Sequence, residues 1–164
     1  ILRFPEQHHN LVRLGIGLYG VSPVEGDKPF EEVCSLRSRI SQIRTYAAGS
    51  SISYGRTTVL EQDTPVATIP IGYADGMPRA ASDGRAHVLV GGQRCAVLGK
   101  ICMDMLMVDL SNAPKAQVGE EVLLFGQMGD DRLSINELAS AARTIPYEIL
   151  VNVSERVKRV YVNS

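Results

Sequence analysis

The chain has 164 residues, of which 45% belong to the hydrophobic set AVILMFWYC and 21% are charged. This composition excludes a largely disordered chain, and the formal net charge of −1 argues against a nucleic-acid-binding protein or a polybasic membrane binder. No apolar run approaches the roughly 18 residues of a membrane span. The sequence opens at Ile1 without an initiator methionine or a signal-peptide pattern, so we read it as a piece of a longer polypeptide.

Aromatic and metal-ligating residues are scarce. There is no Trp, with only three Phe and six Tyr, so we expect an aliphatic core. Cys34, Cys95 and Cys102 are odd in number and form no CxxC pair, so they indicate neither a disulfide framework nor a zinc site. They favour a cytoplasmic protein in a reducing compartment. The three histidines are too scattered for a metal cluster, and no metal is expected.

The first 24 residues differ in pattern from the rest. The stretch RLGIGLYGVSP is a short apolar run broken by three glycines, which predicts a strand end followed by a phosphate-type loop. The residues GDKP at 26–29 are typical of a linker, so we place a boundary at 24–29. The predicted organisation is one unit at 1–24 and a second domain at 25–164.

Gly15, Gly17 and Gly20 match the spacing GxGxxG. A dinucleotide site would need a helix directly after them, and Pro23 ends any such pattern, so we disfavour that interpretation. Two alternatives stay open: a loop of backbone N–H groups that binds a single phosphate, and a plain glycine-rich turn.

Strand-like runs separated by turn signals fill the middle of the chain, at 35–46, 65–72, 85–90, 93–98, 105–110 and 121–125. We treat the first run as a single strand. Gly91-Gly92 favours a two-residue hairpin, because both glycines can adopt positive φ. Several short strands with glycine-rich turns predict a mainly β, barrel-like or sandwich-like domain.

The last third contains helix signals. Ser134 and Glu137 form a capping box at the start of a helix that continues to Ala142. Pro146 suits the first turn of a second short helix, which we expect to run to about Val153. The alternating stretch RVKRVYV at 156–162 predicts a final strand.

Three loops carry residues that could be functional. Tyr54 lies in SYGRT and Tyr73 in IPIGYADG, although a tyrosine at a strand end is most often a core-edge residue. Met103 belongs to KICMDMLM, in which Met105 and Met107 are expected to pack in the core. The neighbouring Cys102 could be a nucleophile, but no histidine lies near it in sequence. Composition and spacing therefore predict a β-rich domain with three conspicuous loops and do not name a reaction.

Taken in order, the motifs RLGIGLYG, SYGRT, PIGYADGMPR, GKICMDM, VGEEV, TIPYEI and RVKRVYV resemble alanine racemase, a fold-type III enzyme that uses pyridoxal phosphate. The resemblance covers nearly the whole chain. It implies the mainly β C-terminal domain with two short helices, preceded at 1–24 by a remnant of the (β/α)8 barrel that holds its final strand. The implied activity interconverts L- and D-alanine for peptidoglycan. The implied assembly is a head-to-tail homodimer in which this domain completes the partner's site.

The resemblance also assigns site residues. Tyr54 matches the catalytic base that faces the cofactor lysine across the substrate, and the backbone N–H of Met103 matches the contact to the substrate carboxylate. Tyr73 and Arg79 match the entrance corridor, and Lys100 and Ile145 resemble further corridor positions.

Four further residues match cofactor contacts. Arg13 matches the donor to the pyridine nitrogen. Gly15 and Ile16 match backbone donors to the cofactor phosphate, to which Tyr147 matches the hydroxyl donor. The lysine that forms the Schiff base with pyridoxal 5'-phosphate is not in this chain, so we expect the isolated chain to be inactive.

Two alternatives to this function remain. The chain could be a non-catalytic β domain for dimerisation or docking, or part of a multi-domain fusion enzyme that carries a racemase. Serine is also possible as substrate, because residues upstream of this chain help to define the pocket.

Overall fold

The computed structural model describes residues 3–22 and 30–162. The chain divides into two compact units, Ile1–Cys34 and Ser35–Ser164, which are described separately. The boundary predicted at 24–29 lies outside the described residues. Within the described part, no helix is long and apolar enough to cross a membrane.

The first unit contains two 3-10 helices, η1 (Pro5–Gln7) and η2 (Gly15–Tyr19). The strand predicted in this unit is absent from residues 3–22. Glycine content explains the difference, because Gly15 (φ 59°) and Gly20 (φ 79°) have left-handed backbones that interrupt an extended chain. Gly20 also approaches another segment closely, since a Cβ there would lie 2.0 Å from the Glu31 carbonyl oxygen.

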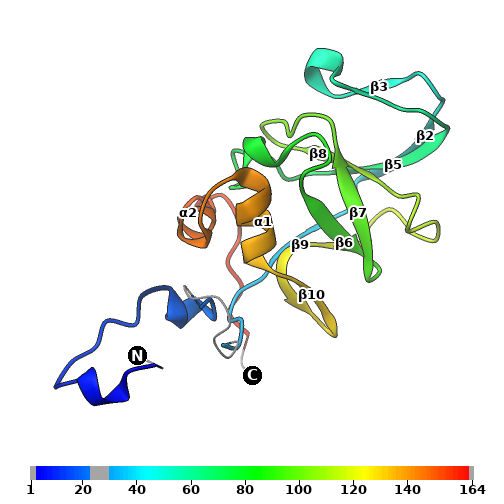
Figure 1. The fold of residues 1–164 in the computed structure, drawn as a ribbon. Helices are drawn as coiled ribbons and strands as arrows, with labels where there is room; N and C mark the ends of the chain where they lie inside the picture. The colour runs from blue at the N-terminus through cyan, green and yellow to red at the C-terminus, as the bar shows by residue number, and fades with distance from the viewer. Residues whose placement is uncertain (1–2, 23–29, 163–164) are drawn as a thin grey trace. The chain divides into compact units, whose positions relative to one another are not determined.

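The second unit is built on antiparallel strands (Figure 1). They are β1 (Leu36–Arg39), β2 (Gln42–Tyr46), β3 (Ser51–Ile52), β4 (Thr58–Val59), β5 (Thr64–Ile69), β6 (His87–Val90), β7 (Gln93–Leu98), β8 (Leu106–Asp109), β9 (Glu121–Met128) and β10 (Asp131–Leu133). The main sheet has the order β1-β9-β6-β7-β8-β5-β2, β10 pairs with β9, and β3 pairs with β4 separately. The sheet curls into a half-barrel, so the predicted mainly β, barrel-like fold is confirmed.

The predicted single strand at 35–46 is two strands. β1 pairs with β9 and β2 pairs with β5, and these pairs lie at opposite ends of the sheet. The change of partner occurs at Ile40, whose N–H binds the Glu120 carbonyl (3.0 Å), and Ser41, whose N–H binds the Thr68 carbonyl (2.9 Å). Because only residues 40 and 41 separate β1 from β2, the two ends of the sheet must lie close together, and the sheet curls. The polar, imperfect alternation of the run at 35–46 gave no sign of this change of partner.

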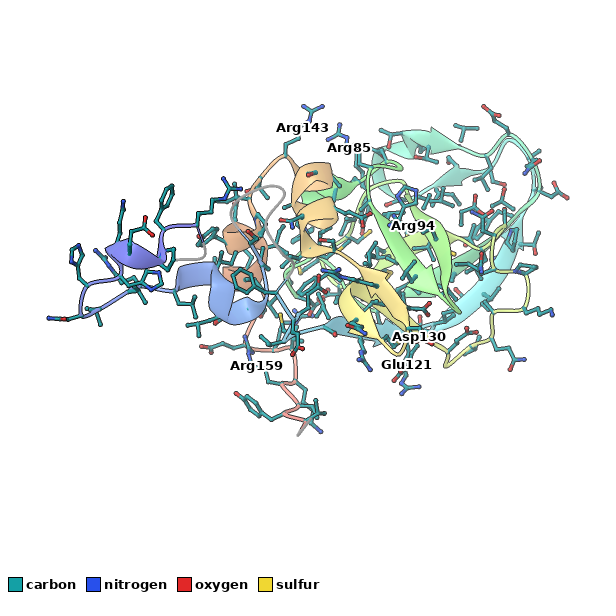
Figure 2. All side chains as sticks on the ribbon, turned by 60° about the horizontal axis from the view of Figure 1, so that its bottom comes forward. Arg85, Arg94, Glu121, Asp130, Arg143 and Arg159 are labelled. Carbon is teal, nitrogen blue, oxygen red and sulfur yellow. The ribbon has the colours of Figure 1, made fainter. Side chains whose placement is uncertain are left out.

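The predicted hairpin is confirmed. β6 and β7 pair with Val90 opposite Gln93, and Gly91 and Gly92 have φ values of 52° and 75°. The core is aliphatic, as predicted. Its largest fully buried side chains come from the strands, from the connections after β1, β5, β7 and β8, and from the last helix: Ile40, Ile69, Met77, Ile101, Leu106, Leu110, Leu123, Leu124, Ile149, Val88, Val90 and Val97. Charged side chains such as Arg94 and Asp130 lie at the surface (Figure 2).

Two α-helices follow the sheet, α1 (Ile135–Ala142) and α2 (Pro146–Val151). Both were predicted. Ser134 caps α1 as expected, because its hydroxyl accepts a hydrogen bond from the Asn136 N–H at 3.2 Å. Glu137 does not complete the predicted capping box. Its carboxylate instead forms an ion pair with Arg94 of β7, with 2.7 Å between Glu137 Oε2 and Arg94 Nη2.

Two further predictions were wrong. Residues 156–162 form no strand, and Val160, Tyr161 and Val162 are exposed. An alternating pattern forms a strand only beside a partner, and none of the described strands pairs with this segment. Met105 is 45% exposed rather than in the core, because the Cys102 N–H binds the Met105 carbonyl at 2.9 Å. That turn ends the extended geometry on which the alternation argument rested, whereas Met107 packs against a buried cluster as predicted.

Candidate functional site

Two of the three conspicuous loops are joined backbone to backbone. The Tyr73 N–H binds the Cys102 carbonyl and the Ala74 N–H binds the Met103 carbonyl, both at 3.0 Å. This approach requires glycine at position 72, because a Cβ there would lie 2.3 Å from both carbonyl oxygens. The structure therefore places Tyr73 and Met103 on adjoining loops, and both side chains are about half exposed.

The Tyr54 loop adjoins the same region. The Ser53 hydroxyl donates to the Lys100 carbonyl at 2.6 Å and lies 3.6 Å from Cys102 Sγ. The Tyr54 side chain is 74% exposed and lies in η3 (Tyr54–Arg56). Ser53 (φ 66°) and Arg56 (φ 52°) hold left-handed conformations that cost non-glycine residues free energy. Such backbone strain persists only where neighbouring contacts maintain it, and the Ser53 hydrogen bond is one of them.

Asp83 supplies a second anchor for the Tyr54 loop. Its carboxylate accepts a hydrogen bond from the Thr57 hydroxyl at 2.9 Å and forms an ion pair with Lys100. These contacts, the Lys100 hydrogen bond foremost, lower the pKa of Asp83 below its ordinary value of 3.8. Sequence reasoning missed Asp83, because nothing in SDGR indicates that two distant loops meet there.

Replacing Asp83 with Asn tests this anchor. A lowered folded-state pKa means that the carboxylate stabilises the fold above its unfolded-state pKa, and that this stability is lost as the pH falls through the lowered value. At pH 7 we expect Asp83→Asn to lower the free energy of unfolding by about 1 kcal/mol. The difference from the wild type should shrink in acid, as measured by urea unfolding over a pH series.

The exposed Asp130 offers a matched control. Asp130→Asn should leave the free energy of unfolding within about 0.5 kcal/mol of the wild type. A loss in Asp83→Asn that stays the same at every pH would contradict a role for the Asp83 charge.

Two of the four predicted corridor residues, Tyr73 and Arg79, line a cavity of about 550 Å³ between the Tyr73 loop and α2, whereas Lys100 and Ile145 are not part of its wall. Tyr73 and Arg79, which opens η4 (Arg79–Ala81), contribute to its wall together with Arg143 and Glu148. Tyr147 lies in α2 and is about half exposed, and Ile145 is exposed at the N-cap of the same helix. The wall of this cavity therefore carries both positively and negatively charged side chains.

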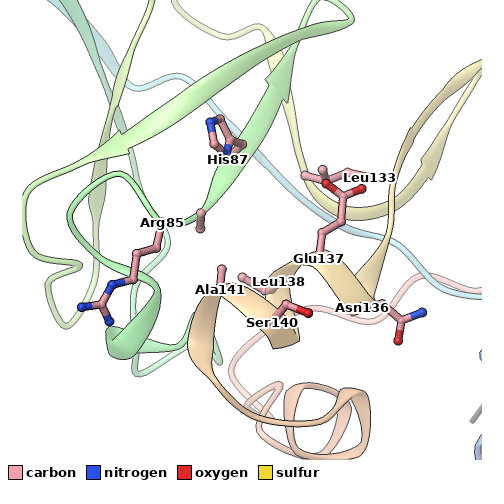
Figure 3. A pocket seen from close by; sticks show the side chains of 9 residues that line it. Arg85, His87, Leu133, Asn136, Glu137, Leu138, Ser140 and Ala141 are labelled. Atoms are coloured by element: carbon pink, nitrogen blue, oxygen red, sulfur yellow. The ribbon is translucent and has the colours of Figure 1, made fainter.

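A second cavity of about 410 Å³ lies between β6 and α1 (Figure 3). Arg85, His87 and Glu137 are among the side chains around it. None of the predicted site residues lines it, so the cavity belongs to another part of the domain.

The thiols of the second unit show no sign of nucleophilic chemistry. Cys95 is fully buried, and desolvation raises the pKa of its thiol to about 11. The Cys102 thiol donates to the Lys100 carbonyl at 3.6 Å. Among the described residues, no group of three His, Cys, Asp or Glu side chains is placed to hold a metal ion.

The remaining predicted residues lie in the first unit. Arg13 is exposed just before η2, Gly15 opens that helix, and the Ile16 side chain is buried. Gly15 and Ile16 stand at the first positions of a 3-10 helix, where backbone N–H groups lack an intrahelical acceptor.

These features define a curled β domain whose connecting loops carry a surface-exposed candidate site. A sequence model described as "Alanine racemase, C-terminal domain" matches residues 33–161. The chain therefore belongs to the alanine racemase family and contains its C-terminal domain.

Individual relatives agree with this assignment. The alanine racemase of Carboxydothermus hydrogenoformans is 41% identical over 167 residues, which cover 99% of this chain and 45% of that protein. The alanine racemase of Desulfovibrio desulfuricans is 46% identical over 165 residues, covering 99% and 43%. The chain thus spans less than half the length of these relatives.

Solved structures show the same fold. The crystal structure of alanine racemase from Streptomyces lavendulae matches with a TM-score of 0.90 at 38% identity. The match covers 99% of this chain and 44% of the Streptomyces chain. The alanine racemase of Bartonella henselae, with covalently bound pyridoxal phosphate, has a TM-score of 0.83 at 33% identity, covering 90% and 40%.

Proposed function

We propose that this chain is the C-terminal part of an alanine racemase that interconverts L- and D-alanine for peptidoglycan. The observation that carries the proposal is the meeting of three motif loops. Ser53 ties the Tyr54 loop to Lys100, and the Met103 loop is hydrogen-bonded to the Tyr73 loop. A tyrosine, a backbone donor and a corridor residue are thereby gathered on one region of the domain.

The donor set fits pyridoxal phosphate. Arg13, the backbone N–H groups of Gly15 and Ile16, and the Tyr147 hydroxyl all offer hydrogens, which the phosphate oxygens and the pyridine nitrogen can accept. When bound, the cofactor withdraws electrons from the substrate α-carbon and makes its proton acidic. Arginine stays protonated and can only donate, so Arg13 would hold the pyridine nitrogen as an unprotonated acceptor and would limit that withdrawal.

Racemisation removes the α-proton from one face and returns a proton on the other, so it needs a base on each face. We assign Tyr54 to one face of the partner subunit's substrate. Its exposure on a braced loop suits a side chain that acts outside its own domain.

Met103 acts through its main chain. We assign its N–H to the substrate carboxylate, a contact in which the side chain is free to vary. The Met103 carbonyl is already held by the Ala74 N–H, which fixes the backbone at that point. Tyr73 and Arg79 line the cavity beside this loop and suit the entrance corridor.

The assembly we propose is a head-to-tail homodimer of the full-length protein. Apolar side chains of the site loops and α2 are exposed in this chain, which is what a surface covered by a partner requires: Met103, Met105, Ile145 and Val151. The free cysteines of the described residues support a cytoplasmic location, since a reducing compartment keeps thiols unpaired.

The isolated chain should not racemise alanine. None of its lysines stands in a motif that matches the cofactor lysine, so the base for the second face is absent. We expect no D-alanine above the rate of free pyridoxal phosphate when the purified chain, the cofactor and L-alanine are mixed. Chiral chromatography measures the product, with the full-length protein as the positive control. D-Alanine formed by the isolated chain at a rate close to that of the full-length protein would contradict the assignment.

A further inference from the structure

A buried carboxylate and an exposed one meet on a single arginine behind the Met103 loop. Arg156 Nε lies 2.9 Å from Asp75 Oδ1, and Arg156 Nη2 lies 2.5 Å from Asp104 Oδ1. The Asp75 side chain is only 12% exposed, and its second oxygen accepts the Gly72 N–H at 2.8 Å. The hydrogen bond to Asp104 and the charge of Asp75 raise the pKa of Arg156.

The segment that carries Arg156 is itself docked on the Tyr73 loop. The Ser154 N–H binds the Asp75 carbonyl at 3.2 Å, and the Arg156 N–H binds the Ser154 hydroxyl at 3.3 Å. Gly76 permits this approach, because a Cβ there would lie 2.6 Å from the Asn152 carbonyl oxygen. Arg156 therefore reaches Asp104 from a base that is already fixed to the Tyr73 loop.

The two carboxylates belong to the two loops that the site needs together. Asp75 lies in the Tyr73 loop, and Asp104 directly follows Met103. On one side the loops are joined by the bonds from Tyr73 and Ala74 to the carbonyls of residues 102 and 103. On the other side, Arg156 joins them by pairing with both Asp75 and Asp104. Together with the backbone hydrogen bonds, this ion pair completes a ring of contacts around the Met103 backbone.

The ring sets the direction of the Met103 N–H. In a trans peptide the N–H points opposite to the C=O of the same planar group. The Cys102 carbonyl points at the Tyr73 N–H, so the Met103 N–H points away from the Tyr73 loop. Arg156 also offsets the negative charge of Asp104, one residue from a donor to which we assign a carboxylate.

We propose that Arg156 is a positioning residue for the substrate-carboxylate contact, acting through Asp75 and Asp104 without touching substrate. This inference rests on the proposed function of Met103. In the full-length protein, Arg156→Met should raise the KM for alanine about tenfold while kcat stays within about threefold, because binding of ground state and transition state weakens alike. Arg156→Lys keeps the charge but cannot bind both carboxylates through separate nitrogens, so it should give an intermediate KM.

Arg159 provides a matched control three residues away. Its guanidinium donates to the backbone carbonyls of Val153, Ser154 and Val157 and forms none of the carboxylate contacts described here. Arg159→Met should leave KM and kcat within about twofold of the wild type.

Hydrogen exchange of the 164-residue chain supplies a readout that does not depend on activity. In Arg156→Met the amides of Tyr73 and Ala74 should exchange about tenfold faster, whereas the Leu124 amide in β9 should keep its rate. If Arg156→Met does not fold, Asp104→Asn removes the charge that pairs with Arg156 and should speed exchange at the same two amides. Wild-type exchange at both amides, or an equal rise at Leu124, would overturn the proposal.

The exchange result separates the two possible failures. If the full-length wild type does not racemise alanine, the proposed function fails, and the exchange rates still decide whether Arg156 holds the loops together. If racemisation is present but Arg156→Met has the wild-type KM, the positioning role alone is overturned.

Discussion

Tyr54→Phe in the full-length protein should lower kcat for racemisation by about 10²- to 10⁴-fold, the usual range for losing a positioned general base. The substitution removes only the hydroxyl of a side chain that is 74% exposed, so the free energy of unfolding should stay within about 0.5 kcal/mol of the wild type. Because the two enantiomers of alanine have equal free energy, kcat/KM must fall equally in both directions. Coupled assays of D- and L-alanine formation measure both values.

Exchange of the α-proton with D2O locates the defect. With the base on one face lost and the lysine on the other retained, Tyr54→Phe should still exchange the α-proton of one enantiomer while it fails to invert it. Tyr161→Phe is the control, since that tyrosine is 92% exposed and lies in no site loop. A non-catalytic docking domain predicts nearly full racemisation by Tyr54→Phe, and that outcome would refute our assignment.

Gly72→Ala should be the most damaging of the small changes to the joined loops. The backbone of Gly72 is not left-handed, so the penalty is purely steric: the new Cβ would lie 2.3 Å from the carbonyl oxygens of Cys102 and Met103. Relief requires the loops to separate and to lose the hydrogen bonds from Tyr73 and Ala74. We expect the free energy of unfolding to fall by about 3 kcal/mol, measured by urea unfolding of the 164-residue chain.

Gly49→Ala separates this steric penalty from general sensitivity to alanine. Gly49 has a left-handed backbone (φ 82°), and a Cβ there would meet nothing within 4 Å, so its cost is conformational and about 1 kcal/mol. In the full-length protein, Gly72→Ala should also raise the KM for alanine, because the displaced loop carries Met103. Equal losses of stability in the two variants would show that the close approach at Gly72 is unimportant.

Elements with strong local signals were predictable. The Gly91-Gly92 turn identified the β6–β7 hairpin, Ser134 marked the start of α1, and Pro146 marked the start of α2. In each case the signal is a backbone preference of one or two residues, which operates without knowledge of the rest of the fold.

Elements that depend on a distant partner were not predictable. The switch at Ile40 is decided by hydrogen bonds to Glu120 and Thr68, and the segment at 156–162 stays outside the sheet for want of a neighbouring strand. The roles of Asp83 and Arg156 were not predictable for the same reason, since each joins segments that are far apart along the chain. Met105 was misplaced because a local turn replaced the extended geometry.

By itself the sequence determined a mainly β domain with an aliphatic core, two short helices and an ordered set of motifs that resembles one enzyme family. Local backbone preferences and side-chain hydrophobicity suffice for these conclusions. Only the tertiary structure decided how the sheet curls, which loops meet, and that Asp83 and Arg156 brace the loops of Tyr54 and Met103. The physical reason is that ion pairs and close backbone approaches join residues far apart in the chain, and their energies depend on distances that no local pattern encodes.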